Sequence, residues 1–158
     1  MKKFLATVFS IILMVTLTAC GSAGTAPPAN TGNADQKTEK TIRIKIIVGQ
    51  NILTATLLDN ATTRSFIAKF PLTLPMQDLY AREMCYHFPD PLPASEAARS
   101  GYEIGDLSYW TPCNSLVIFY KQNGEVINNL QKLGRIDSGV DVFEQTGDID
   151  VTFELFNS

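Results

Sequence analysis

The chain has 158 residues, and its 16 acidic residues slightly outnumber its 13 Lys and Arg residues, so the net charge at pH 7 is −3. This balance argues against a nucleic-acid partner, which needs a basic patch. Once the unusual first forty residues are set aside, the remainder is the right size for one domain and too short for two.

The first twenty residues have the three parts of a secretory signal. Two lysines are followed by an almost wholly apolar stretch over residues 4–16, and the segment ends in Leu17-Thr18-Ala19-Cys20. This tetrapeptide is a lipobox, in which small residues precede the cysteine that carries the lipid. The apolar stretch falls short of the roughly 20 residues of a transmembrane helix, although an uncleaved anchor is the alternative. We predict a lipoprotein signal peptide over residues 1–19 and a lipidated Cys20.

Residues 20–40 contain no large apolar side chain. They cannot bury a core, so we expect a flexible tether that holds a domain over residues 41–158 away from a lipid surface. Neither Gly21 nor Ser22 is the Asp that retains many lipoproteins in an inner membrane. The predicted location is therefore extracytoplasmic, with a lipid anchor in the cell membrane or the outer membrane.

Alternating apolar residues predict β-strands at both ends of the domain. In residues 42–48 and again in 149–155, apolar and polar side chains follow one another with period two, which is typical of a strand with one buried face. Residues 115–120 are apolar on both faces and predict a central strand. Because pairing of the two ends would remove exposed edges, this pattern favours a closed barrel.

Turn and capping residues mark the other predicted elements. Gly49-Gln50-Asn51 turns the first strand into a second over residues 52–58. Asn123-Gly124 predicts a hairpin that joins the strand at 115–120 to one at 125–127. A helix is predicted over residues 62–69, starting near Asn60 and ending before Pro71.

Three further motifs follow these elements in a specific order. They are Phe70-Pro71-Leu72-Thr73-Leu74-Pro75-Met76-Gln77-Asp78-Leu79, then Glu103 to Pro112 leading into Ser115 to Tyr120, and finally Leu133-Gly134-Arg135-Ile136. In this order, the chain resembles the bacterial cyclophilin-like family over essentially all of residues 41–158. The resemblance implies a mostly β fold, a closed eight-stranded barrel with one or two short helices.

The resemblance also directs attention to Arg82. Cyclophilins that isomerise X-Pro bonds use an arginine that hydrogen-bonds the proline nitrogen, which weakens an amide whose rotational barrier is roughly 18–20 kcal/mol. Those enzymes carry a Phe-His-Arg run followed by Phe-Met and Gln. This chain has Tyr80-Ala81-Arg82-Glu83-Met84 at the comparable place, without that His, Phe or Gln. Arg82 is a candidate by position only, and the alternative is an arginine paired with Glu83 or Asp78.

Other candidate ligand-binding residues are Glu83, Tyr86, Tyr109 and Trp110. The last two follow Gly105-Asp106 and either line a groove at the barrel rim or plug the end of the barrel. His87 is the only histidine in the chain. A Ser/His/Asp triad or a multi-histidine metal site therefore cannot be assembled, and we predict no metal and no cofactor.

Two cysteines, Cys85 and Cys113, remain once Cys20 is lipidated. Outside the cytoplasm a pair of thiols can form a disulfide. Cys85, however, has apolar neighbours, among which a free buried thiol is common. Both states stay open.

The end of the chain is acidic. After Arg135 it has no Lys or Arg, but it has Asp137, Asp141, Glu144, Asp148, Asp150 and Glu154. We predict a solvated face that keeps the domain soluble, with calcium binding as the alternative.

The sequence thus predicts a lipid-anchored barrel that binds a ligand, a peptide or an envelope protein without catalysis. An extracytoplasmic peptidyl-prolyl cis-trans isomerase that assists the folding of secreted proteins is the alternative. The two differ in whether Arg82 faces an open apolar pocket or is buried and paired. A purely structural accessory of a membrane complex would instead show a large apolar patch and no concave site.

Overall fold

A computed structural model describes residues 41–156; the predicted signal peptide (1–19) and tether (20–40) lie outside them. In chain order the elements are β1 (Ile42–Val48), β2 (Asn51–Leu57), α1 (Ala61–Ile67), β3 (Leu72–Leu79), β4 (Glu83–His87), β5 (Ala98–Gly101), β6 (Asp106–Trp110), the 3-10 helix η1 (Thr111–Cys113), β7 (Ser115–Phe119), β8 (Val126–Ile136), the 3-10 helix η2 (Val140–Gln145) and β9 (Ile149–Leu155). None of the helices in this part of the chain is long and apolar enough to cross a membrane.

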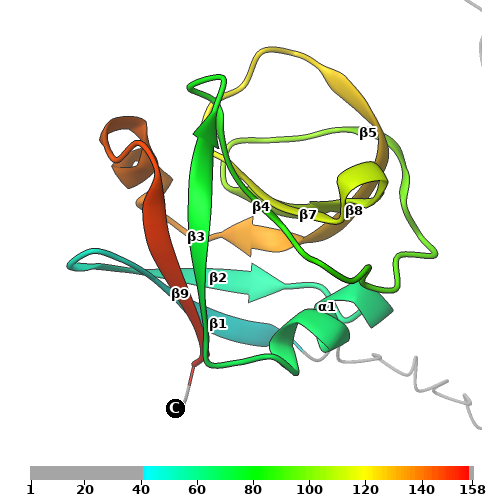
Figure 1. Ribbon diagram of the computed structural model, residues 1–158, viewed down its shortest axis with the longest axis horizontal. Coiled ribbons are helices and arrows are strands. Elements are labelled where there is room, and N and C mark those ends of the chain that lie inside the picture. The colour runs from blue at the N-terminus through cyan, green and yellow to red at the C-terminus, as the bar shows by residue number, and fades with distance from the viewer. Residues whose placement is uncertain (1–40, 157–158) are drawn as a thin grey trace, which may run out of the picture. The chain divides into compact units, whose positions relative to one another are not determined.

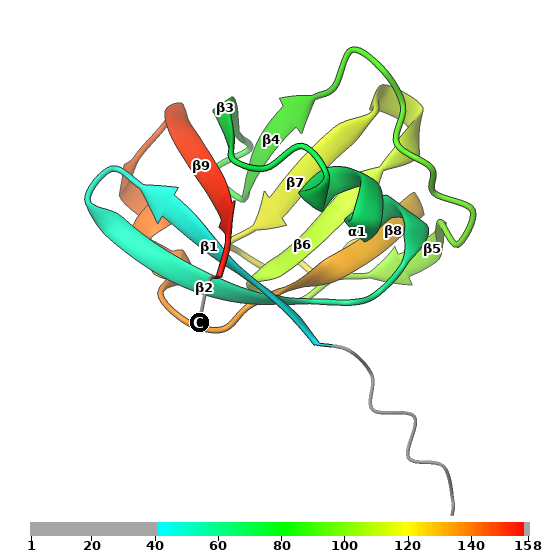
Figure 2. The same ribbon diagram turned by 90° about the horizontal axis from the view of Figure 1, so that it is seen from below.

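Eight strands form a closed antiparallel ring (Figures 1 and 2). Their order is β2-β1-β9-β3-β4-β7-β6-β8, and the ring closes because β8 pairs with β2. The predicted eight-stranded barrel is therefore confirmed. β1 pairs with β2 on one side and with β9 on the other, so the two ends of the domain lie side by side, as predicted. β5 pairs only with β8, outside the ring, and the sequence did not predict this ninth strand.

Gly134 permits the closure of the ring. It lies on β8 opposite Leu57 of β2, in a pairing that covers only three residues of each strand. A Cβ atom at this position would lie 2.3 Å from the carbonyl oxygen of Thr56 and 2.7 Å from the Cα of Leu57. Only glycine lets the two backbones approach this closely.

The main core fills the inside of the barrel. The inward-facing residues Ile44 and Ile46 of β1 and Phe153 of β9 are fully buried there. Phe66 of α1 joins them, with its ring centroid 5.2 Å from that of Phe153. Asn60 caps this helix as predicted, because its side chain accepts a hydrogen bond of 2.8 Å from the backbone N–H of Thr63.

The predicted hairpin at Asn123-Gly124 is wrong. β7 pairs with β4 and β6, and β6 lies between β7 and β8, so the two strands flanking this turn never meet. All five residues of β7 are buried, which agrees with the central strand predicted there. We call residues 121–130, the connection after β7 and the first part of β8, the arch; it passes over the top of the barrel in Figure 1.

A second apolar cluster lies under the arch, on the outer face of the barrel wall. It contains Cys85 of β4, Val117 and Phe119 of β7, Tyr102, and Leu130 of the arch. The ring of Tyr102 stacks on that of Phe119 with 3.9 Å between centroids. The arch is thus packed against the wall at this point and borders a concave surface beside it.

Candidate functional site

The concave surface under the arch is a groove of about 320 Å³. Its floor is made by the outward side chains of β4 and β7, and its opposite wall by the arch. The residues lining it include Cys85, Val117 and Phe119 on the floor, Trp110 from β6, Ile127 and Leu130 from the arch, Arg82, Glu83 and Glu125 at one end, and His87 and Ser115 at the other. We call this surface the groove.

Arg82 is paired with two carboxylates. Its Nη2 and Nε atoms lie 2.6 and 3.0 Å from Oε2 of Glu83, and its Nη1 atom bonds the carboxylate of Glu125 in the arch. The Arg82 side chain is only 12% exposed. The pairing with Glu83 that the sequence left as an alternative is therefore present, whereas Asp78 accepts a hydrogen bond from the hydroxyl of Tyr120.

The pKa values of Glu83 and Arg82 respond differently to this environment. Burial raises the pKa of Glu83, and the attraction of Arg82 only partly offsets this. For Arg82, burial acts to lower the pKa, but the hydrogen bond to Glu125 and the charge of Glu83 raise it overall. Arg82 therefore remains protonated, and the neighbouring carboxylates of Glu83 and Glu125 balance its positive charge.

The turn between β3 and β4 sets the position of Arg82. Tyr80 and Ala81 have φ angles of 60° and 47°, and the N–H of Arg82 donates to the carbonyl of Leu79 across the turn. Two successive non-glycine residues in the left-handed region of backbone conformation are energetically unfavourable. The carbonyl of Arg82 accepts hydrogen bonds of 2.9 and 3.1 Å from the N–H groups of residues 120 and 121. Backbone and side chain thus both join this hairpin to the arch.

The two aromatic candidates on β6 have different roles, because neighbouring residues of a strand point to opposite faces. Tyr109 is fully buried in the main core, where its hydroxyl donates to Asn114 and accepts from the N–H of Leu92. Trp110 is half-buried, lines the groove, and donates from Nε1 to the carbonyl of Asn128 in the arch at 3.0 Å. Tyr109 therefore plugs the barrel and Trp110 lines the groove.

Tyr86 likewise points to the opposite face of β4 from its neighbours Cys85 and His87. It packs against the main core, with its ring 5.1 Å from that of Phe88, while Cys85 and His87 line the groove. Nδ1 of His87 lies 2.7 Å from Oγ of Ser115. Within residues 41–156, no group of three His, Cys, Asp or Glu side chains is placed to hold a metal ion.

Cys85 and Cys113 are both free thiols, so the disulfide that the sequence left open is not formed. The register places Cys85 opposite Val117, whereas Cys113 lies in η1, two residues before the partner of His87. Cys85 is 3% exposed and its burial raises the pKa of the thiol, which makes it a poor nucleophile. Cys113 is exposed.

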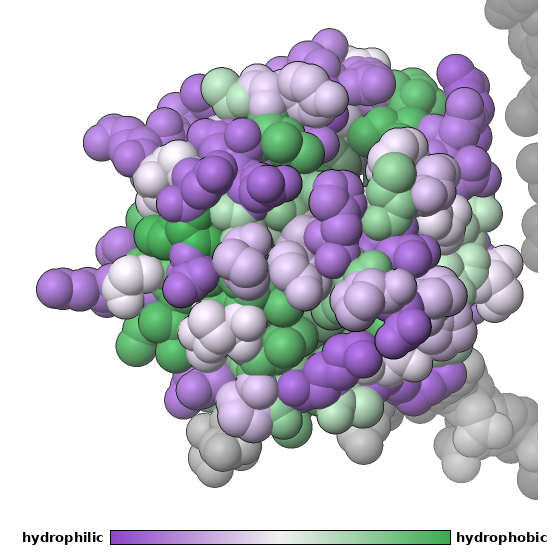
Figure 3. Space-filling model, viewed as in Figure 1, coloured by the Kyte–Doolittle hydropathy of each residue, from purple (hydrophilic) through white to green (hydrophobic). Residues whose placement is uncertain are grey.

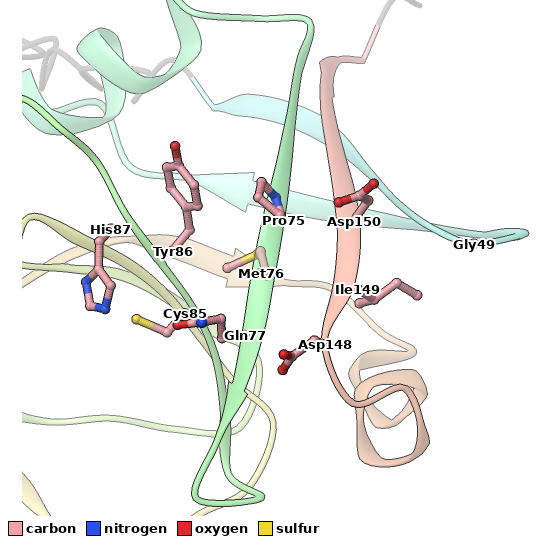
Figure 4. Close-up of a pocket in the computed structure, with 10 residues that line it drawn as sticks. All are labelled: Gly49, Pro75, Met76, Gln77, Cys85, Tyr86, His87, Asp148, Ile149 and Asp150. Carbon is pink, nitrogen blue, oxygen red and sulfur yellow. The ribbon is translucent and has the colours of Figure 1, made fainter.

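A second, more open concavity of about 830 Å³ adjoins the groove (Figure 4). It is lined by β3, β4, the start of β9 and the β1–β2 turn, with Gln77, Asp148 and Asp150 as polar residues, and it shares Cys85 and His87 with the groove. We call it the trough. Sequence reasoning missed it; its only signal was the outward-facing Gln77 of β3 and the acidic Asp148 and Asp150 at the start of β9, two segments far apart in the sequence.

Comparison with known proteins agrees with this architecture. The model of the cyclophilin-like family matches residues 46–154. The chain belongs to this family. No curated protein matches the chain.

One solved structure with a similar fold is the solution structure of the hypothetical protein AF2241 from Archaeoglobus fulgidus. Its TM-score is 0.61 at 15% identity, over 77% of this chain and 99% of that one. At this identity the likeness concerns the cyclophilin-like fold alone, so an argument about function has to come from the site.

In this cyclophilin-like barrel, only some of the sequence-predicted residues come together. Arg82, Glu83 and Trp110 line the groove. Tyr109 faces the main core, whereas Tyr86 packs against that core and also lines the trough. The arch residues that complete the groove were missed, because no spacing rule connects residues 125–130 with residues 82–87.

Proposed function

We propose that this cyclophilin-like barrel is a non-catalytic binding module of the cell envelope. The observation that carries the proposal is that the guanidinium of Arg82 donates hydrogen bonds to the carboxylates of Glu83 and Glu125. An isomerase needs guanidinium N–H groups that point at the proline nitrogen of its substrate. A guanidinium that is largely shielded from solvent and bonded to two carboxylates is not poised to do this.

The shape and chemistry of the groove support binding. An apolar floor with a few polar groups at its ends is the usual composition of a ligand site. On the face shown in Figure 3, hydrophobic residues form small patches between hydrophilic ones. The exposed large apolar side chains belong to separate segments, from Ile52 on the β1–β2 hairpin to Phe156 after β9. These features favour a concave site over the broad apolar patch of a structural accessory.

The lipobox supports a location for this module. A lipid on Cys20, followed by a tether over residues 21–40, would hold the barrel on the extracytoplasmic side of the cell membrane or outer membrane. Its partners there would be a peptide or an envelope protein.

The alternative is an extracytoplasmic prolyl isomerase, and one observation favours it: Arg82 stands at the rim of an apolar groove. To act, Arg82 would have to release a carboxylate and expose its N–H groups. A misplacement of about 1 Å can cost roughly a hundredfold in rate. We therefore place binding ahead of catalysis.

The proposal is tested by crosslinking in native membranes. The protein is expressed with a photo-crosslinking residue in place of exposed Tyr80, at the rim of the groove, and crosslinked partners are identified by mass spectrometry. Ile127→Ala, which removes apolar contacts in the groove, should lower the yield of the specific crosslink at least fivefold. The matched change Ile52→Ala, on the exposed β1–β2 hairpin, should leave it unchanged. Equal yields in both variants would contradict the proposal.

A further inference from the structure

We infer that the groove and the trough act as one surface for an extended peptide, which carries an apolar side chain at one end and lysine or arginine side chains at the other. This inference rests on the proposed function, since it names the partner of that same site.

The strand register gives the surface its direction. Gln77 of β3 is opposite Cys85 of β4, Cys85 is opposite Val117 of β7, and all three face outward. Asp148 extends this row beyond β3, because its Oδ1 atom accepts a hydrogen bond of 2.8 Å from the backbone N–H of Asp78. A row of side chains therefore runs across the strands from the trough into the groove.

The length of this row fits a short peptide. Neighbouring strands lie about 4.8 Å apart, so the path from β9 across β3 and β4 to β7 covers about 14 Å. An extended chain advances about 3.3 Å per residue, so four or five residues would cover this distance. In Figure 4, Gln77 lies beside Cys85, with Asp148 on one side of this pair and His87 on the other.

The two ends of the surface differ in how enclosed they are and in the polar groups they hold. Under the arch, Phe119, Ile127 and Leu130 enclose an apolar space beside the indole of Trp110. This end can take a leucine-sized side chain out of water. The trough is more open, and beside the apolar Pro75 and Ile149 it holds the polar side chains of Gln77, Asp148 and Asp150.

Charge decides which peptide fits. The carboxylates of Asp148 and Asp150 line the trough, and neither takes part in any ion pair found in residues 41–156. At the far end of the groove, Arg82 offsets only one of its two glutamate partners. Arg82 is the only Lys or Arg among the described residues that line the groove and the trough, and its charge is thus already neutralised. A cationic ligand end is therefore favoured and an anionic one is repelled.

The test uses the fluorescence of Trp110, the only tryptophan in the chain. The whole chain in non-ionic detergent is titrated with acetylated, amidated hexapeptides. Each has two leucines at one end and either two lysines or two glutamates at the other, in both chain directions. We expect a lysine peptide to shift the Trp110 emission with at least tenfold higher affinity than its glutamate counterpart, and the difference should shrink in 0.5 M salt.

Variants locate the charge effect. Asp150→Asn and the double change Asp148→Asn/Asp150→Asn keep the side-chain size and an acceptor oxygen. Each exposed ion pair is typically worth a factor of about 1.5 to 5 in affinity, so the double variant should weaken the lysine peptide by about 2- to 25-fold. Glu96→Gln removes one acidic charge at the gap between β2 and β5, away from the trough, and should leave affinity unchanged.

The outcomes separate the inference from the proposed function. Equal affinity for lysine and glutamate peptides would overturn the charge inference and leave groove binding in place. A lysine preference that persists in the Asp148/Asp150 double variant would also overturn it. If no peptide shifts Trp110 emission up to millimolar concentration, the peptide-binding function itself fails. If lysine amide alone reproduces the shift, the surface binds small cations and the peptide assignment is wrong.

Discussion

Replacement of Gly134 by alanine tests the closure of the barrel. The new Cβ would lie 2.3 Å from the carbonyl oxygen of Thr56, and an ordinary contact of about 3.4 Å requires β2 and β8 to separate by about 1 Å. Both obstructing atoms nearest to it belong to the β2 backbone, so no side chain can simply rotate away. Such overpacking costs about 1–3 kcal/mol. The loss of one or two hydrogen bonds at the short β2–β8 pairing adds about 0.5–1.5 kcal/mol for each.

We therefore expect Gly134→Ala to lower the free energy of unfolding by about 2–5 kcal/mol, measured by urea denaturation followed by circular dichroism. Gly101→Ala in β5 is the matched control, because a Cβ there meets no atom within 4 Å and its φ is ordinary. The control should be neutral or slightly stabilising. Equal stability of the two variants would refute the close crossing of β2 and β8.

Three further changes have defined outcomes. Burial acts to raise the pKa of Asp137, but hydrogen bonds from Thr54 and Thr56 lower it overall. The stabilisation by this carboxylate is therefore complete above its ordinary pKa of about 3.8 and is lost as the pH falls through the lower pKa of the folded state. The unfolding free energy of Asp137→Asn should thus depend less on pH below about 4 than that of the wild type, and an unchanged acid slope in urea titrations would disprove this. Asp106 is 1% exposed and binds one lysine and one arginine of β8, so Asp106→Asn should cost about 1–3 kcal/mol in urea denaturation at pH 7, and a wild-type midpoint would disagree. Cys20→Ala should abolish incorporation of labelled lipid and release the protein from the membrane fraction, whereas continued labelling would exclude lipidation at this residue.

Local patterns predicted the parts of the fold that depend on local physics. The alternation in β1 and β9 reports one buried face, and both strands lie in the ring with their apolar side chains inside. Asn60 was recognisable as a cap because its partner, the N–H of Thr63, lies only three residues away.

The missed elements depend on contacts between distant segments. Asn123-Gly124 has the composition of a hairpin turn, but β6 already occupies the edge of β7 at which a hairpin partner would pair. β5, Ala98-Arg99-Ser100-Gly101, is short and mostly polar, so no alternation reveals it. It exists because β8 continues beyond its short pairing with β2 and offers the rest of that edge to β5, on the side opposite β6.

In the candidate site, too, contacts between neighbouring residues could be predicted and contacts between distant segments could not. The pairing of Arg82 with Glu83 follows from adjacency in the sequence and was considered as an alternative. Its second partner, Glu125, is 43 residues away, and only the path of the arch brings the two together. The sequence left Tyr109 and Trp110 with the same two alternatives; they point to opposite faces of β6, and the position of the arch puts Trp110 at the groove.

The central claim is that Arg82 has a structural role in a binding module and does not catalyse isomerisation. The most direct test is a proline-isomerisation assay on the whole chain in non-ionic detergent, with wild type and Arg82→Ala compared after circular dichroism shows that both are folded. We predict weak acceleration at most, equal within about twofold in the two proteins because the guanidinium is bonded to Glu83 and Glu125. Strong acceleration by the wild type that disappears in Arg82→Ala would contradict the account and establish the isomerase.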